Sequence, residues 1–193
     1  TGRACCAIGM FDGVHLGHAH LLRRLQAAAA RRGLTPVVLT FSNHPLSVLR
    51  PELPIVLITS LKERLELLHA PGIEHVIPIT FTRELSLHSP AEFKGALYEC
   101  LELRHFVVGP DFALGHDREG TVPVLATLGS KLGYTVEAVD TFLEAWAAHG
   151  VPLRSGRDLR DDRFLVVGVD VDAEAPSGCS IDALVRQMKV LER

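Results

Sequence analysis

The run Gly9–His18, with the sequence GMFDGVHLGH, constrains this chain more than any other segment because it joins a strand pattern to a helix pattern. Ahead of it, Ala4–Ile8 is a short apolar run that is suited to a buried strand. Behind it, leucines and alanines recur at helical spacing between Leu21 and Ala29. The carboxyl end of a first strand is where an α/β protein places its ligand. The run therefore predicts an α/β fold with a phosphate-binding turn.

Two histidines fall in the first turn of the predicted helix. His15 and His18 lie three residues apart and on one helical face. Unpaired backbone N–H groups and the positive end of the helix dipole attract anions there, and they keep an imidazole neutral and able to donate a hydrogen bond. Gly17 leaves room for a ligand, and Gly9 and Gly13 permit a sharp turn. We therefore expect His15 and His18 to be hydrogen-bond donors to a bound phosphate.

Two other interpretations of the histidine pair compete with this one. Histidines at this spacing bind metals, but neither has an adjacent Glu as in the His-Glu-x-x-His motif, and no third ligand lies nearby, so we expect no metal ligands in the protein. The pair could also be ordinary polar caps, with the glycines as loop residues. The concentration of unusual residues in one short run favours the ligand-binding interpretation.

The composition limits the class of protein. The chain has 193 residues, 47% of them apolar, which is enough for one domain or for one domain with an appendage. A net charge of −3 with interspersed signs gives no basic stripe, so we expect no nucleic-acid partner. The cysteines lack Cys-x-x-Cys spacing, which indicates reduced thiols and a cytoplasmic protein. No apolar run approaches the length of a membrane span, so we expect no membrane partner.

Strand and helix patterns alternate along the first 140 residues. Apolar runs predict strands, and helical spacing with two Ser-x-x-Glu capping boxes predicts helices between them. The strands are expected at 36–41, 75–79, 105–108 and 135–139, and the helices are expected to begin near residues 16, 61, 90 and 122. Strands separated by helices pair in parallel through right-handed crossovers. The predicted fold class is therefore α/β, a doubly wound parallel sheet of Rossmann-like type.

The pattern changes near residue 140. A helical run at 142–146 and a charged stretch at 154–163, either a surface loop or a linker, precede the apolar strand pattern Phe164–Val169 and a final amphipathic helix. We expect a small C-terminal α/β appendage that packs on the first domain, with Phe164–Val169 adding to its sheet. The expected domains are therefore 1–140 and 141–193.

Four motifs follow one another within residues 4–140. They are Gly9–His18, Thr40–Pro45, Phe81–Phe93, and Val107–Gly115 with Gly120 downstream. In this order they resemble the N-terminal adenylyltransferase module of prokaryotic FAD synthetase, the bifunctional riboflavin kinase/FMN adenylyltransferase family. The resemblance implies a nucleotidyltransferase fold of the His-x-Gly-His type. It also implies a reaction in which AMP passes from ATP to FMN, with Mg²⁺, to give FAD and pyrophosphate.

The resemblance assigns roles to residues of three of the four motifs. Catalysis would rest on His15 and His18, since attack of a phosphate oxygen on the α-phosphorus needs fixed donors and good alignment. ATP would be bound by Gly9, Phe11, Asp12, Gly13, Gly17, Gly109 and Asp111. FMN would be bound by Thr40, Phe41, Asn43, His44, Pro45 and Phe112. Of these, Phe41 and Phe112 fit a core or a pocket wall better than stacking platforms, and His44 also fits a simple turn.

The sequence departs from the family pattern in several places. The Ile-Ser-Ser-Thr-x-Ile-Arg segment that holds the ATP phosphates in the family is absent, and the nearest candidate, Leu153–Arg160, keeps a Ser and two suitably spaced arginines, Arg157 and Arg160. Asn43 replaces a usual Pro, and Ala113–Leu114 stands where Arg-Phe is usual. We expect no riboflavin kinase domain in the residues that follow. Instead, Ser177–Asp182 resembles the Ser-Gly-Cys-Ser-Ile-Asp signature of a small uncharacterised bacterial family.

These departures keep two alternatives open. One is a catalytically impaired module that binds nucleotide or flavin without turnover, because it lacks the family's phosphate motif. The other is AMP transfer to a different phosphorylated acceptor, such as a pantetheine or nicotinamide mononucleotide, which the Phe-Asp-Gly and Asp111–Phe112 motifs disfavour. The expected partners of the protein are small-molecule nucleotides and flavin. The oligomeric state does not follow from the sequence.

Overall fold

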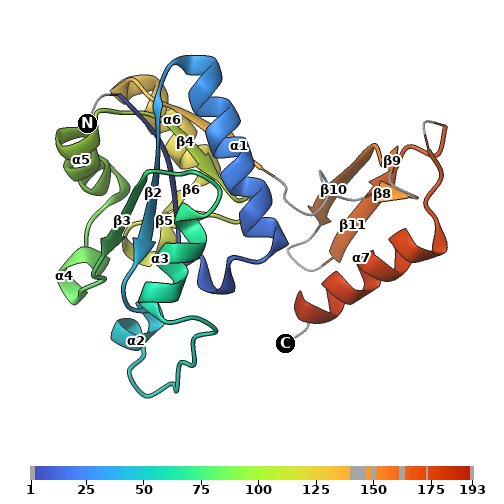
Figure 1. Ribbon diagram of the computed structural model, residues 1–193, viewed down its shortest axis with the longest axis horizontal. Coiled ribbons are helices and arrows are strands. Elements are labelled where there is room, and N and C mark those ends of the chain that lie inside the picture. The colour runs from blue at the N-terminus through green and yellow to red at the C-terminus, as the bar shows by residue number, and fades with distance from the viewer. Residues whose placement is uncertain (1–2, 140–146, 149–150, 161–163, 173, 192–193) are drawn as a thin grey trace. The chain divides into compact units, whose positions relative to one another are not determined.

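The computed structural model describes residues 3–139, 147–148, 151–160, 164–172 and 174–191 (Figure 1). Its internal contacts divide the chain into two compact units, Thr1–Val139 and Asp140–Arg193. Each unit has its own sheets and its own apolar cluster, so each is described by itself. Among the described helices, none combines the length and the apolar character that crossing a membrane requires.

The first unit is built on a five-stranded parallel sheet with the order β3-β2-β1-β4-β7. Its strands are β1 (Ala4–Gly9), β2 (Thr35–Phe41), β3 (His75–Ile79), β4 (Leu103–Val108) and β7 (Thr135–Ala138). The chain proceeds outward from β1 to β3 and then returns to the other side of β1 with β4. This reversal opens the crevice in which doubly wound folds bind ligands, beyond the carboxyl ends of β1 and β4. The predicted doubly wound parallel sheet is confirmed.

Helices cover both faces of this sheet because the strands are apolar on both sides. The helices are α1 (Leu16–Arg32), α2 (Pro45–Leu49), α3 (Leu61–His69), α4 (Arg83–Ser86), α5 (Pro90–Leu101) and α6 (Val122–Leu132). Cys5 and Ala7 of β1 join the cluster under α1 and α3, whereas Cys6 and Ile8 join the cluster under α5 and α6. This alternation explains why β1 is an unbroken apolar run in the sequence.

The predicted helix starts are confirmed at the two capping boxes. Ser60 Oγ accepts from the Glu63 N–H at 3.3 Å, and the Glu63 carboxylate accepts from the Ser60 N–H at 2.9 Å. At α5, Ser89 and Glu92 make the same pair of hydrogen bonds at 3.3 and 2.8 Å. Each box satisfies backbone donors that have no partner within the helix, so both starts are specified by local sequence.

Several short elements of the first unit escape prediction from periodicity. These are α2, α4 and the small hairpin of β5 (Ala113–Leu114) with β6 (Gly120–Thr121). The hairpin depends on a close approach, because a Cβ at Gly120 would lie 2.6 Å from the Leu114 carbonyl oxygen and 2.8 Å from the Pro90 ring. Elements this short have too few residues for a repeating pattern, so the fold around them decides their conformation.

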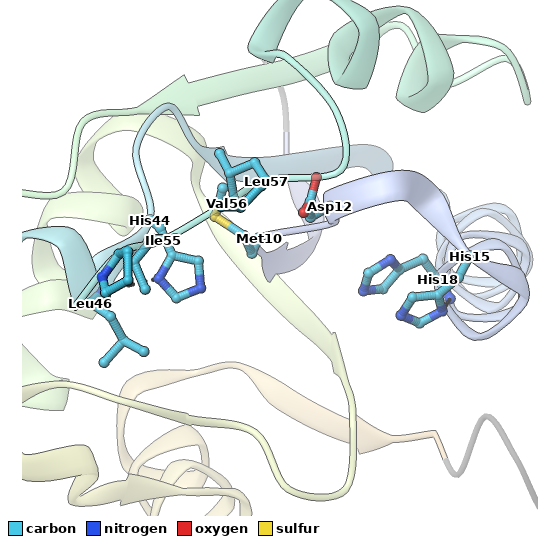
Figure 2. A pocket seen from close by; sticks show the side chains of 10 residues that line it. Met10, Asp12, His15, His18, His44, Leu46, Ile55, Val56 and Leu57 are labelled. Carbon is cyan, nitrogen blue, oxygen red and sulfur yellow. Dashed lines mark hydrogen bonds between the residues drawn. The ribbon is translucent and has the colours of Figure 1, made fainter. Parts of the chain in front are cut away.

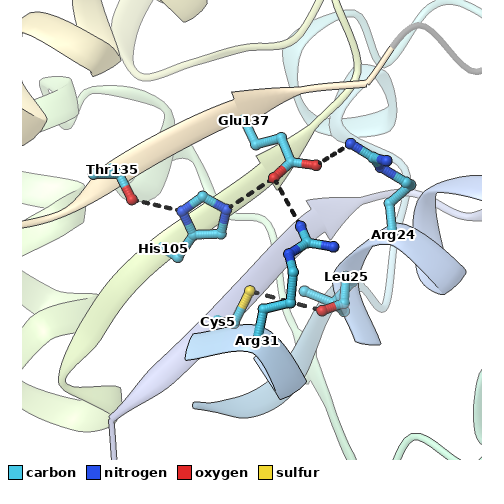
Figure 3. A network of polar contacts seen from close by, with 7 residues as sticks. All are labelled: Cys5, Arg24, Leu25, Arg31, His105, Thr135 and Glu137. Atoms are coloured by element: carbon cyan, nitrogen blue, oxygen red, sulfur yellow. Dashed lines mark hydrogen bonds and ion pairs between the residues drawn. The ribbon is translucent and has the colours of Figure 1, made fainter. Parts of the chain in front are cut away.

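A polar network connects α1 to the edge of the sheet, as Figure 3 shows. Glu137 of β7 accepts from Arg24 at 2.7 Å, and a guanidinium nitrogen of Arg31 lies 3.8 Å from its second oxygen. The buried His105 of β4 shares a hydrogen bond of 2.6 Å between Nδ1 and the Thr135 hydroxyl, and its Nε2 lies 3.4 Å from Glu137. Burial is the largest cause that holds the pKa of His105 below its ordinary value. The network therefore surrounds a neutral histidine with polar partners.

The second unit corrects two expectations. Its elements are β8 (Ala147–Ala148), β9 (Val151–Pro152), β10 (Ser155–Arg160), β11 (Phe164–Val169) and α7 (Gly178–Leu191). The charged stretch forms strand β10, so the prediction of a loop or linker is wrong there. Strand β11 pairs antiparallel with β10 and adds nothing to the five-stranded sheet, so that prediction is wrong too. A neighbouring segment is a better partner because closing a short hairpin loop costs little entropy.

Two of the remaining expectations for the second unit are confirmed, and one concerns residues that the structure does not describe. The apolar strand Phe164–Val169 and the final amphipathic helix are both present. They contribute to one small apolar cluster of Leu153, Val167, Val169 and Leu184. The helical run predicted at 142–146 lies outside the described residues.

Candidate active site

The segment between β1 and α1 is a tight turn with an unusual backbone. Phe11, Gly13 and Val14 have positive φ angles of 52°, 67° and 37°, and Asp12–Val14 form the short helical turn η1. A positive φ is strained for Phe and Val, at a cost on the order of 1–3 kcal/mol per residue, and it persists only where the surroundings enforce it. The Phe11 side chain contributes to this constraint, since it is 2% exposed and belongs to the core under α1.

The two histidines meet at the start of α1, where the sequence predicts them. His15 is the N-cap residue, and the His18 backbone N–H donates to its Nδ1 at 3.3 Å. Figure 2 shows the two rings side by side, and they stack with centroids 3.6 Å apart and planes at 20°. Because Nδ1 of His15 accepts a hydrogen bond, the proton of the neutral ring is on Nε2. His15 therefore offers an Nε2–H donor.

The His18 ring is partly buried and has an unsatisfied nitrogen. Its edge-on neighbour is Phe11, with ring centroids 5.1 Å apart, and its Nδ1 is buried without a hydrogen-bond partner in the described part of the chain. Burial, followed by the charge of His15, lowers the pKa of His18 to about 4. From its position at the helix start, His18 is expected to be neutral because of the helix dipole. In the structure, burial is the largest cause of its lowered pKa. A neutral imidazole carries one N–H, which can donate a hydrogen bond to a ligand.

Two cavities lie at this end of the sheet. The smaller, of about 480 Å³, is lined by Met10, Asp12, His15, His18, His44, Leu46 and the loop Pro54–Leu57 (Figure 2). The larger, of about 800 Å³, has aromatic walls and three cations. The aromatic residues are Phe41, Phe81, Phe93 and Phe112, and the cations are Arg50, Arg83 and Arg118. The smaller cavity is thus suited to hydrogen bonding, and the larger one to a flat apolar group that carries negative charge.

His44 stands at the border of the two cavities. Both cavities are lined by Met10, His44 and Leu46, so they adjoin one another. His44 is the N-cap of α2, and its Nδ1 accepts from the Leu46 N–H at 3.1 Å. Its proton in the neutral form is therefore on Nε2, as in His15. The hydrogen bond makes His44 a fixed donor at the boundary rather than a simple turn residue.

Asp12 faces a neighbouring loop and is already hydrogen-bonded. Its carboxylate accepts from the Ile58 N–H at 2.8 Å, from the Thr59 N–H at 2.9 Å and from the Thr59 hydroxyl at 2.7 Å. Burial acts to raise the pKa of Asp12, but these hydrogen bonds and the charge of Arg64 outweigh it, so the pKa lies below its ordinary value. Asp12 is therefore an ionised carboxylate whose oxygens are taken up by the protein.

The structure brings together only part of the predicted site. His15, His18, Asp12 and His44 gather around the smaller cavity, and Phe41, His44, Pro45 and Phe112 gather around the larger. The other predicted residues line neither of these two cavities: Gly9, Phe11, Gly13, Gly17, Thr40, Asn43, Gly109 and Asp111. The side chains of Arg157 and Arg160, the arginines of the substitute phosphate segment, lie outside the described part of the chain.

Two residues of this second group have a clear supporting contact. The buried Thr40 hydroxyl donates to the Met10 carbonyl at 3.0 Å, which fixes β2 against the turn after β1. The Asn43 side chain donates to the Phe81 carbonyl at 2.9 Å and accepts from the Phe81 N–H at 2.8 Å. A proline side chain cannot form these hydrogen bonds. The Asn that replaces the usual Pro therefore joins its own segment to Phe81.

Sequence reasoning misses the loop Pro54–Leu57 and the three arginines. The arginines stand on separate segments that meet only in the folded chain, so no spacing rule connects them. The sequence does carry a signal, because the apolar run Ile55–Ile58 stands just before a helix cap, and in the structure Val56 is 90% exposed and Ile58 is 80% exposed. Apolar residues that a loop leaves in water are unusual enough to suggest contact with a ligand or partner.

Comparison with known proteins supplies the family. A family model described as FAD synthetase matches residues 1–147. The bifunctional riboflavin kinase/FMN adenylyltransferase of Escherichia coli (strain K12) is 33% identical over 138 residues, which cover 71% of this chain and 44% of that protein. The protein of the same name from Pseudomonas fluorescens is 36% identical over 141 residues, with 72% and 45% covered. That from Bacillus subtilis (strain 168) is 34% identical over 136 residues, with 69% and 43% covered.

A solved structure has a similar fold. It is described as a macrolide-efflux protein from Streptococcus pneumoniae, and it matches this chain with a TM-score of 0.64 and 27% identity over 72% of this chain and 45% of that chain. The chain spans less than half the length of the curated relatives named above. The family match extends across the parallel sheet and the turn that carries His15 and His18. The chain belongs to the FAD synthetase family.

Proposed function

We propose that this chain is an FMN adenylyltransferase, which transfers AMP from ATP to FMN and releases FAD and pyrophosphate. The observation that carries the proposal is the pair of adjoining cavities that share His44. One offers imidazole donors at the start of a helix, and the other offers aromatic walls with arginines. The names of the relatives, which combine riboflavin kinase with FMN adenylyltransferase, support the same assignment.

The smaller cavity is assigned to the triphosphate of ATP. Nε2–H of His15 and the ring of His18 would donate to oxygens of the phosphates, with the N-terminus of α1 behind them. The predicted ATP residues that line neither of the two cavities would act by shaping the turn and the strand ends, as the glycines and Phe11 do. Negative charge grows on the phosphoryl oxygens in the transition state, so donors fixed by the fold lower the barrier.

Mg²⁺ is assigned to the substrate rather than to the protein. It would arrive on the phosphate oxygens of ATP, as Mg²⁺ commonly does in phosphoryl-transfer sites. Within the described residues, no three His, Cys, Asp or Glu side chains gather closely enough to hold a metal ion. Asp12, the carboxylate of the smaller cavity, already accepts three hydrogen bonds from the protein. The chain's contribution is therefore to bind the metal–nucleotide complex through its phosphates.

The larger cavity is assigned to FMN. The flat isoalloxazine ring would lie against Phe41 and Phe112, and the phosphate would point to His44 at the shared border. A phosphate oxygen of FMN then attacks the α-phosphorus of ATP, and the bond from that phosphorus to the bridging oxygen breaks to release pyrophosphate. A phosphate monoester already carries about −1.5 to −2 charge at pH 7, so the reaction needs no general base from the protein. Alignment by His44 and charge stabilisation by His15 and His18 are sufficient roles.

The test is direct. The full chain is incubated with ATP, Mg²⁺ and FMN, and FAD is followed by chromatography, with a phosphopantetheine and nicotinamide mononucleotide as competing acceptors. We expect FAD and no adenylylated product from the other acceptors. Binding of ATP and FMN by a folded chain without FAD would support the impaired binding module instead. Product from another acceptor alone would move the assignment to that acceptor.

A variant pair tests the flavin side of the assignment. Phe112→Ala removes an aromatic wall of the larger cavity, so we expect the KM for FMN to rise about tenfold while the KM for ATP stays within about twofold. Leu67→Ala, which truncates a side chain that is 42% exposed on α3 and lines neither cavity, is the matched control. Equal changes in both KM values would contradict the assignment of FMN to the larger cavity.

We also infer a cytoplasmic location and small-molecule partners only. The buried free thiols of Cys5 and Cys6 support a reducing compartment, where such thiols persist. The absence of a basic stripe in the sequence supports a protein that does not bind nucleic acid. Fractionation of cells and a nucleic-acid retention assay on the full chain would test the two statements.

A further inference from the structure

The strained turn between β1 and α1 receives little support from its own backbone. Its one local backbone hydrogen bond among the described contacts joins the Val14 N–H to the Phe11 carbonyl at 3.2 Å. Phe11 and Val14 nevertheless hold positive φ angles of 52° and 37°. Non-glycine residues keep such angles when surrounding groups over-determine the conformation. The groups that hold this turn must therefore come from elsewhere in the chain.

Thr59 supplies most of that support. Its hydroxyl donates to Asp12 Oδ1 at 2.7 Å and accepts from the Gly13 N–H at 3.2 Å, which uses both functions of the group. Its backbone N–H donates to the same carboxylate at 2.9 Å, and the Ile58 N–H donates to the other oxygen at 2.8 Å. Two consecutive residues of the turn are thus bonded to one residue that lies more than 40 positions later.

The site of attachment is rigid. Thr59 directly precedes Ser60, the N-cap of α3, and the capping box of Ser60 fixes this helix start. Within α3, the guanidinium of Arg64 is fully buried, donates to the Phe41 carbonyl at 2.7 Å and faces the charge of Asp12. The segment formed by Thr59 and the helix that follows it is therefore attached both to the histidine turn and to the end of β2, where the wall of the larger cavity begins.

We propose that Thr59 is a positioning residue for the catalytic pair, because its hydroxyl holds the Asp12–Gly13 turn in the conformation that stacks His15 on His18. The effect on turnover rests on the proposed function, whereas the effect on the rings does not. Thr59 lines neither cavity, so its influence passes through the turn rather than through contact with a substrate. The close packing of the turn leaves little room for other support, since a Cβ at Gly13 would lie 3.3 Å from Ile58.

Two variants distinguish the contribution of the Thr59 hydroxyl from that of the shape of its side chain. Thr59→Val keeps the branched side chain and removes both hydroxyl hydrogen bonds, whereas Thr59→Ser keeps the hydroxyl and removes a methyl group. Thr127→Val is the matched control, because the Thr127 hydroxyl makes one local hydrogen bond of 3.0 Å to the Pro123 carbonyl on the exposed face of α6. All three variants are made in the full chain, and melting temperatures are measured first.

The first readout is FAD formation. A small displacement of catalytic groups costs up to about 10²-fold in rate, so we expect Thr59→Val to lower kcat about 10-fold or more with the KM for FMN nearly unchanged. Thr59→Ser and Thr127→Val should stay within about twofold of the unchanged chain. Equal losses in Thr59→Val and Thr59→Ser, or no loss in either, would overturn the proposal.

The second readout does not require activity. The ring resonances of His18, assigned by their disappearance in His18→Ala, should shift in Thr59→Val and stay in place in Thr59→Ser and Thr127→Val. If the unchanged chain makes no FAD, the proposed function fails while this measurement still decides on Thr59. Unchanged His18 resonances in a folded Thr59→Val would overturn the positioning role.

The remaining possible outcome is that Thr59→Val fails to fold. If Thr59→Val does not fold, Thr59→Ala replaces it, because alanine removes the hydroxyl without placing a new methyl group against the Asp12 carboxylate. Loss of folding in both variants would make Thr59 a determinant of folding, and this would overturn the positioning role.

Discussion

His18 and His105 occupy two regions of the first unit that use the same side chain in different ways. Burial lowers the pKa of both rings. His105 has the Thr135 hydroxyl 2.6 Å from Nδ1 and Glu137 3.4 Å from Nε2, and it lines neither of the two cavities (Figure 3). His18 lines the smaller cavity, and its buried Nδ1 has no partner in the described part of the chain (Figure 2).

The contrast shows which observation indicates function. A lowered pKa is common to structural and catalytic groups, so it does not distinguish these two histidines. Each ring also has a buried nitrogen without a hydrogen-bond partner in the described part of the chain, Nδ1 in His18 and Nε2 in His105. Glu137 faces the nitrogen of His105 at 3.4 Å, whereas His18 alone of the two lines one of the two cavities, so its place beside a cavity is what distinguishes it. We therefore propose that His18 takes part in the chemistry and that His105 stabilises the fold, and the following changes test that division.

The largest effect is expected from His18→Ala. The substitution removes a donor aimed at charge that develops in the transition state, so kcat for FAD formation should fall roughly 10²-fold or more, with little change in melting temperature. His20→Ala, two residues further along α1 and outside both cavities, is the control and should keep kcat within about twofold. If His18→Ala melted the protein or left FAD formation unchanged, the two histidines would not differ in the way proposed.

The reverse pattern is expected from His105→Ala. Removal of this fully buried ring leaves a cavity and deprives Thr135 and Glu137 of a polar neighbour, so the free energy of unfolding at pH 7 should fall by about 2–4 kcal/mol. The kcat of the folded variant should remain within about threefold of the unchanged chain. Urea denaturation and FAD formation measure the two quantities, and a large fall in kcat without loss of stability would contradict the division.

The sequence predicts His18 better than it predicts the surroundings of either histidine. The strand–turn–helix pattern around Gly9–His18 is local, so residue type and spacing identify the turn, the cap and the histidine pair. The His18 ring packs against Phe11, and its Nδ1 is buried without a hydrogen-bond partner in the described residues. Residue type and spacing do not predict this burial. Likewise, the partners of His105 come from β7, some 30 positions later, and only the parallel sheet brings them together.

The same distinction separates the two units. Capping boxes, glycine turns and unbroken apolar runs predict the five-stranded sheet because each signal lies within a few residues. The partner of β11 could not be predicted in this way, because an apolar strand pattern shows that a strand exists but not which strand it joins. Asp12 illustrates the limit within the site itself, since the family resemblance implies contact with ATP while its hydrogen bonds go to Ile58 and Thr59.

A smaller effect is expected from Glu137→Gln, which weakens the environment of His105 without touching His18. Burial acts to raise the pKa of Glu137, but the hydrogen bond and charge of Arg24 outweigh it, so the pKa in the folded chain lies below its ordinary value. A carboxylate of this kind stabilises the fold above its unfolded-state pKa, and the contribution is lost as the pH falls through the folded-state value. We expect a loss of about 1 kcal/mol at pH 7.

The pH dependence provides the control for this variant. The difference in unfolding free energy between Glu137→Gln and the unchanged chain should shrink as the pH falls below about 4, where the unfolded carboxyl is protonated. Urea denaturation at pH 7 and at low pH measures it. A difference that stays constant with pH would show that the lost stability comes from packing rather than from the charge of Glu137.

The smallest effect is spectroscopic and compares the two histidines directly. The pKa of His18 is lowered to about 4, so its ring should stay neutral in an NMR titration from pH 8 to pH 5, where an ordinary imidazole gains a proton. Because the depressed pKa belongs to the folded state, the stability contributed by the neutral ring is complete above about pH 6.5 and declines as the pH falls toward 4. Addition of ATP with Mg²⁺ at pH 7 should then shift the His18 ring resonances, since His18 lines the smaller cavity to which we assign the triphosphate, and should leave those of His105 in place, since His105 lines neither cavity. Equal shifts of both rings would mean that the nucleotide changes the fold as a whole, and a shift of His105 alone would place the nucleotide away from the smaller cavity.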